Sequence, residues 1–170
     1  MPPTRALRRE GLLTALDADE PGLAIGDAAA RHVRLTTRGA TAYVGDDPGA
    51  FAPWSQIRAI VIDPPTTWAP NPALVDSIGP IVEGLFGGIG GIVEETPTFE
   101  VRVEGIDGEP RVWRATLHYL SGYRKKDARF ASRLIDALVG RPETRALLAH
   151  PAELLDRLGK VVRETDRWVT

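Results

Sequence analysis

Histidine side chains are the first candidates for acid–base or metal chemistry, because imidazole titrates near neutral pH and ligates zinc. The chain has three of them, His32, His118 and His150. No two stand in an HxH or HExxH spacing, and His32 and His118 fall in different predicted strands. We therefore expect structural histidines and no metal site.

Motifs for nucleophilic or nucleotide chemistry are missing as well. No serine stands in a GxSxG motif, and the glycines match neither the dinucleotide fingerprint nor the P-loop. The chain has no cysteine, which excludes disulfides, thiol nucleophiles and cysteine-ligated zinc. The carboxylate pairs Asp46-Asp47 and Glu94-Glu95 fall in predicted loops, where solvation explains them. We therefore expect no catalytic residue, no cofactor and no enzymatic activity.

A basic cluster is the one group of side chains suited to binding an anion. Arg124, Lys125 and Lys126 precede a predicted helix, and Arg129 and Arg133 continue the cluster four residues apart on one helical face. Two interpretations stay open. The cluster could bind phosphate or a lipid headgroup, or it could be a solvated loop and helix face, which is the more common case.

Composition fits an ordinary globular chain. It has 170 residues, of which 43% are apolar and 26% charged. A net charge of -2 argues against strong general attraction to nucleic acid. No apolar stretch follows the basic residues at the N-terminus, so we expect no signal peptide and a cytoplasmic location.

The N-terminal half is predicted to hold a helix and then strands. Residues 1–20 contain a short helix in this interpretation, because Leu7, Leu12 and Leu16 fall near one face. Residues 31–45 alternate like a hairpin that turns at Arg38-Gly39. A break is expected at residues 46–49, followed by a buried strand over residues 55–62.

A second hairpin and a closing helix are predicted in the C-terminal half. Apolar residues alternate with charged ones over residues 98–105, and Asp107-Gly108 is a strong hairpin turn before a strand over residues 112–119. Asp127 is expected to cap a helix that runs to Gly140. Two helical stretches over residues 143–149 and 152–168 should follow.

The run over residues 33–44, the segment 53–57, the Asp107-Gly108 hairpin and the closing helix together resemble a bacterial pleckstrin-homology-like (PH-like) domain. The resemblance covers roughly residues 22–140. It implies one α+β domain with a curled antiparallel sheet closed by a C-terminal helix. Some such domains bind phosphoinositides through a basic first hairpin, where this chain has only Arg34 and Arg38. The insert at residues 71–95 and the helical extension at 141–170 depart from the family pattern.

The insert is the most unusual segment. Its apolar residues recur at helical spacing, yet six glycines between Gly79 and Gly91 would each cost about 1 kcal/mol against alanine in a helix. Such a helix needs a surface to hold it. Three interpretations stay open: packing on its own sheet, a homo-oligomer interface, or insertion into a membrane interface.

These patterns predict a non-catalytic interaction or scaffold module that self-associates. The expected contacts are Leu85, Phe86 and Ile89 of the insert and Leu155, Leu158 and Val162 of the last helix. One alternative is a peripheral membrane protein that uses the insert together with Arg124, Lys125 and Lys126. A further alternative is a hydrophobic-ligand carrier or an unrecognised enzyme.

Overall fold

The computed structural model describes residues 4–67, 97–119 and 121–167. They form an α+β structure whose larger sheets are antiparallel, as expected from the sequence. The first sheet is a six-stranded meander in chain order. Its strands are β1 (Arg5–Glu10), β2 (Leu13–Asp17), β3 (Gly22–Ile25), β4 (Arg31–Leu35), β5 (Gly39–Val44) and β6 (Asp47–Pro53).

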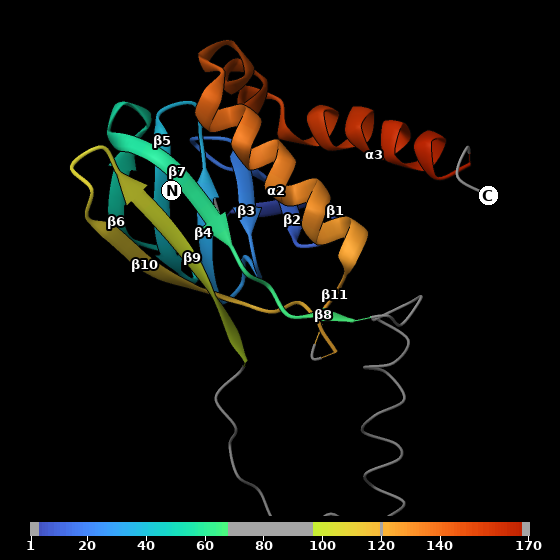
Figure 1. Cartoon of the computed structure of the whole chain (residues 1–170), viewed down its shortest axis with the longest axis horizontal. Coiled ribbons are helices and arrows are strands. Elements are labelled where there is room, and N and C mark those ends of the chain that lie inside the picture. The colour runs from blue at the N-terminus through green and yellow to red at the C-terminus, as the bar shows by residue number, and fades with distance from the viewer. Residues whose placement is uncertain (1–3, 68–96, 120, 168–170) are drawn as a thin grey trace, which may run out of the picture.

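The second sheet has three strands and lies against the first (Figure 1). Its central strand is β9 (Thr98–Gly105), flanked by β7 (Ile57–Ile62) and β10 (Pro110–Thr116). β10 lies close to β4. A curled sheet was predicted, but neither of the two larger sheets is strongly curled. A separate parallel pair joins β8 (Thr66–Thr67) to β11 (Tyr123–Arg124).

Four helical segments complete the described residues: η1 (Trp54–Gln56), α2 (Lys125–Gly140), η2 (Pro142–Ala149) and α3 (Pro151–Arg167). α2 packs on β7 through its buried face, and α3 contacts β1 and β2. Figure 1 shows α2 lying across one side of the two sheets and α3 extending away from it. No helix among the described residues combines the length and apolar character needed to cross a bilayer.

The predicted second hairpin is confirmed. Phe99, Val101 and Val103 are buried and alternate with exposed or half-buried charged residues along β9. Trp113 and Ala115 of β10 are also buried, because they face the same core. The period-two pattern therefore identified both the strands and their inner face.

The predicted N-terminal helix is wrong. Residues 5–17 form the β1–β2 hairpin, with Gly11 at its turn at a φ of 57°. All but the last residue of β2 are buried, so its run of apolar side chains belongs to a strand covered on both faces. The spacing of Leu12 and Leu16 suits a helix equally well, and this ambiguity caused the error.

The predicted break at residues 46–49 is also wrong, because β6 begins at Asp47. β6 is the last strand of its sheet, and an edge strand tolerates Pro48, since one side of its backbone needs no partner. The turn lies just before it, at Gly45-Asp46. Asp46 and Asp47 are both exposed, as solvated carboxylates should be.

The closing helix is confirmed, but its start differs from the prediction. α2 begins at Lys125, and Asp127 lies in its first turn rather than at the cap. The carboxylate of Asp127 accepts hydrogen bonds from Arg124 at 2.8 and 3.2 Å, which occupies the group that was expected to cap the helix. The stretch expected to be helical at residues 143–149 is the 3-10 helix η2, and the last helix is confirmed as α3.

Candidate functional site: a cleft between α2 and the end of β7

A cleft of about 380 Å³ lies between the end of β7, the segment that leads into β8, and one face of α2. We call it the basic cleft. Its residues divide by chemistry into an apolar group, an uncharged or acidic polar group, and three cations. They are Ile62, Pro64 and Ala128; Asp63, Thr66 and Ser132; and Lys125, Arg129 and Arg133.

Helix geometry explains why the three cations share this cleft. Residues four apart on an α-helix lie on one face and about 6 Å apart along the axis. Lys125, Arg129 and Arg133 have this spacing, all three are exposed, and none forms an ion pair within the described part of the chain. Like charges at this spacing cost a helix about 0.2–0.5 kcal/mol per pair. The row therefore slightly destabilises α2 unless an anion covers it.

The β8–β11 pair holds the two walls of the cleft together. Tyr123 is paired with Thr66, and the backbone N–H of Tyr123 donates to the carbonyl oxygen of Pro65 at 2.9 Å. Gly122 precedes it with a φ of 85°, and a Cβ at this position would lie 2.5 Å from that carbonyl oxygen. Only glycine allows the start of α2 to approach the Pro65 segment this closely.

A buried hydrogen-bond network supports the same junction. The backbone N–H of His118 donates to the Tyr123 hydroxyl at 3.0 Å, and that hydroxyl also lies 3.0 Å from His118 Nδ1. His118 Nε2 lies 3.3 Å from the hydroxyl of Thr14 in β2. The core strand β2 is thereby connected to the residue that begins β11.

Burial keeps both rings of this network neutral. It lowers the pKa of His118 to about 4, with the positive charge of Arg9 adding to the effect. It raises the pKa of Tyr123 to about 12. A neutral His118 can accept a hydrogen bond from the Tyr123 hydroxyl at Nδ1 and donate one from Nε2 to the Thr14 hydroxyl. The network is thus satisfied at neutral pH, and its role is structural.

Charge in the basic cleft is positive although the whole chain is slightly acidic. Asp63 is the one acidic residue that lines it, and it forms no ion pair within the described residues. A neighbouring groove of about 300 Å³ shares Ile62 and Asp63 and is lined by Glu100 and Arg102. These two side chains approach to 3.5 Å and neutralise each other. The positive field is therefore concentrated on the α2 side.

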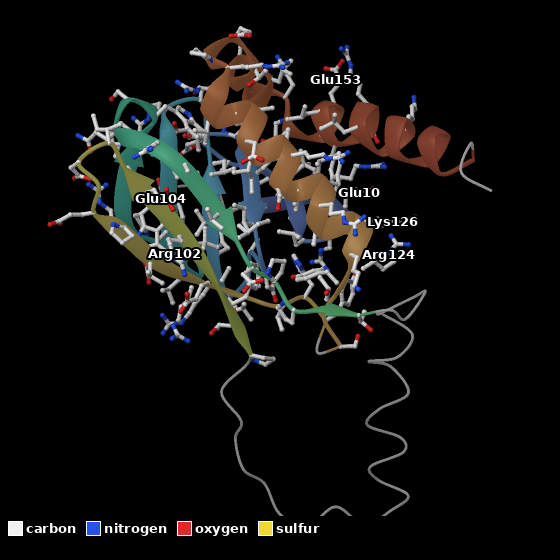
Figure 2. All side chains as sticks on the ribbon, in the orientation of Figure 1. Glu10, Arg102, Glu104, Arg124, Lys126 and Glu153 are labelled. Atoms are coloured by element: carbon white, nitrogen blue, oxygen red, sulfur yellow. The ribbon has the colours of Figure 1, made fainter. Side chains whose placement is uncertain are left out.

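The structure divides the basic cluster that the sequence predicted. Lys125 lines the cleft, whereas Arg124 is bound to Asp127 in a bidentate ion pair and Lys126 is exposed outside the lining. Figure 2 shows Arg124 and Lys126 at the end of α2 nearest the β8–β11 pair. Arg129 and Arg133 line the cleft together with Lys125, and their four-residue spacing in the sequence indicated that they share a helix face. No sequence pattern indicated that Asp63, Thr66 and Ser132 would line the same cleft.

The apolar contact residues predicted for a partner are distributed differently. Leu85, Phe86 and Ile89 lie outside the described residues, as does the side chain of Val162. Leu155 is fully buried, and Leu158 packs partly against the core. The described part of the apolar stripe of α3 is therefore used inside the chain.

The basic residues of the first hairpin do not form a second anion site. Arg34 is only 5% exposed, its guanidinium carbon lies 4.2 Å from the centre of the Tyr43 ring, and it donates to the Thr4 hydroxyl at 3.3 Å. The Arg38 guanidinium lies 2.8 Å from a carboxylate oxygen of Glu20. The guanidinium groups of this hairpin are thus occupied by internal contacts.

The remaining candidates for metal chemistry are dispersed. His32 is buried and stacks on Tyr43 with 5.0 Å between ring centres, so its neighbours differ from those of His118. Burial, with the charge of Arg34, lowers the pKa of His32 to about 4. Within residues 4–67, 97–119 and 121–167, no group of three His, Asp or Glu side chains is placed to hold a metal ion.

Comparison with known proteins gives no family. No family model matches the chain, and no curated protein or solved structure matches it either.

Proposed function

We propose that this chain is a non-catalytic interaction module with a PH-like core, and that it attaches to anionic phospholipid surfaces through the basic cleft. One observation carries the proposal: three exposed cations of α2 line one cleft without an ion-pair partner among the described residues. Phosphate oxygens are the usual partners of clustered Arg and Lys side chains.

The order of elements supports the PH-like part of the proposal. Four consecutive antiparallel strands, β3 to β6, are followed by the three strands β7, β9 and β10 and then by α2. That order agrees with the resemblance noted in the sequence. The β1–β2 hairpin and the elements after α2 are additions to this core. The proposal rests on strand order and the closing helix, not on the curvature of a sheet.

The position of the basic cleft supports attachment to a membrane. Thr66 lines the cleft, and β8 ends at Thr67. The sequence segment that follows β8 contains Leu85, Phe86 and Ile89. Each Lys or Arg near an anionic surface contributes about 1 kcal/mol, so three give about 3 kcal/mol, or roughly a hundredfold in affinity. A second, apolar anchor is therefore needed for stable attachment, and the apolar residues that follow β8 in the sequence are the proposed one.

Liposome co-sedimentation at two salt concentrations tests the proposal. We expect the full chain to sediment with anionic vesicles, less so at high salt, and not with neutral ones. Arg129→Gln/Arg133→Gln should abolish binding, and Leu85→Asp/Phe86→Asp should weaken it at both salt concentrations. Arg58→Gln/Arg114→Gln removes the same charge from exposed strand positions and should bind like wild type. A wild-type chain that stays in solution with every vesicle would contradict the proposal.

A further inference from the structure

We infer that the basic cleft selects phosphomonoesters over phosphodiesters. This inference rests on the proposed function, in that it assumes the cleft binds an anion, and it specifies which one. It concerns the chemistry of the headgroup or metabolite rather than the presence of a membrane.

The charges that line the cleft give the first argument. Lys125, Arg129 and Arg133 face one carboxylate, that of Asp63, so two positive charges are unbalanced. A phosphomonoester carries about -1.5 to -2 charges at pH 7, because its second pKa is about 6. A phosphodiester carries a single charge. A monoester therefore balances the cleft, whereas a diester leaves one cation without a counter-charge.

The arrangement of donors gives the second argument. A monoester presents three terminal oxygens, and the three cations extend from successive turns of α2 on the same face. Ser132 of α2 and Thr66 of β8 add hydroxyl groups to the same lining. A diester has only two terminal oxygens, and its second ester group would displace one donor. More donors surround the cleft than a diester can use.

Asp63 limits the discrimination. Its carboxylate is the one acidic group lining the cleft, and it repels every anion that enters. Coulomb energy scales with the charge of the anion, so a doubly charged monoester meets about twice the repulsion that a singly charged diester meets. We therefore expect Asp63→Asn to raise the affinity for monoesters more than for diesters.

Two soluble probes test the inference directly. Titration calorimetry of the full chain with methyl phosphate and dimethyl phosphate should give an affinity roughly tenfold or more higher for the monoester at about pH 7.5. The ratio should approach one near pH 5, where the monoester also carries a single charge. The titratable groups that line the cleft are Asp63, just after β7, and the three cations of α2, and no histidine lines it.

Vesicles identify the source of the phosphomonoester. Phosphatidic acid exposes a monoester and phosphatidylglycerol a diester, and the two are compared at equal surface charge. Preference for phosphatidic acid indicates a lipid source. Binding of methyl phosphate without binding of any vesicle keeps the inference, assigns a soluble ligand and contradicts membrane attachment.

Variants separate the inference from general charge effects. Arg129→Gln/Arg133→Gln should lose both probes, and Arg58→Gln/Arg114→Gln should keep the wild-type ratio. Equal affinity for the two soluble probes, or equal binding to the two charged vesicles, overturns the selectivity while leaving anion binding intact. Failure of the wild type to bind either probe or any vesicle overturns the selectivity and the proposed function together.

Discussion

At the scale of single residues, the buried histidines make stability depend on pH. His32 and His118 have pKa values lowered to about 4 by burial, against 6.5 for the exposed ring. Between these values the unfolded chain binds more protons than the folded one, so the free energy of unfolding rises with pH. The stability that neutral burial provides is complete above about pH 6.5 and is lost as the pH falls towards 4.

We therefore expect the free energy of unfolding to fall between pH 6.5 and 5, by at most about 1.4 kcal/mol per pH unit for each histidine. Urea unfolding at closely spaced pH values measures it. Ordinary carboxylates stay ionised over most of this window, which isolates the histidines. A free energy that is constant from pH 6.5 to 5 would show that neither ring is held in its neutral form.

Arg34 shows what a single residue's surroundings can hide from sequence. It lies in the predicted first hairpin, and its side chain is buried against Tyr43 and Thr4. Thr4 immediately precedes β1, in the region that was predicted to be a helix. The wrong helix prediction near the N-terminus therefore gave no indication that Arg34 would be buried.

At the scale of elements, the β8–β11 pair decides whether the basic cleft has two walls. Gly122→Ala would place a Cβ at 2.5 Å from the carbonyl oxygen of Pro65, at a φ that L-residues rarely adopt. We expect a loss of about 1–3 kcal/mol in stability and weaker phosphate binding, although no charge changes. Thermal unfolding and calorimetry with methyl phosphate measure the two effects.

Gly108→Ala is the matched control for that substitution. Gly108 has a nearly equal φ of 83°, but a Cβ there meets nothing within 4 Å. It should lower stability through backbone strain alone and leave phosphate affinity unchanged. If both variants weaken phosphate binding equally, the closeness of the β8–β11 contact does not position the cleft.

The elements also show why sequence patterns predicted some of the fold and not the rest. Strands with one buried face, such as β9, alternate visibly and were predicted together with their inner residues. β2 is buried on both faces, so it lost the alternation and was mistaken for a helix. The row of Lys125, Arg129 and Arg133 is visible in sequence because it lies on one helix. Asp63 and Thr66 reach it only through the tertiary pairing of β8 with β11.

At the scale of the whole molecule, α3 connects the C-terminal extension to the N-terminal hairpin. Leu154 and Leu155 are buried where α3 meets β1 and β2, and Leu158 packs partly against the same core. An Arg8–Asp156 ion pair of 2.5 Å joins the two elements at the surface. The first and last described elements are thus one packing unit, so the described half of α3 stabilises the fold of its own chain.

Unfolding of a Leu158 variant at several protein concentrations distinguishes internal packing of α3 from self-association through it. We expect Leu158→Asp to lower the free energy of unfolding by about 1–3 kcal/mol, because a carboxylate replaces a partly buried isobutyl side chain. Leu147→Asp makes the same change at an exposed site of η2 and should be nearly neutral. An internal contact gives a loss that is independent of protein concentration, whereas an interface between copies gives one that grows with concentration, since dissociation is coupled to unfolding. Light scattering on the same samples gives the molar mass. If the mass of Leu158→Asp is half that of wild type while its stability is unchanged, α3 forms an interface between copies and the internal-packing interpretation is wrong.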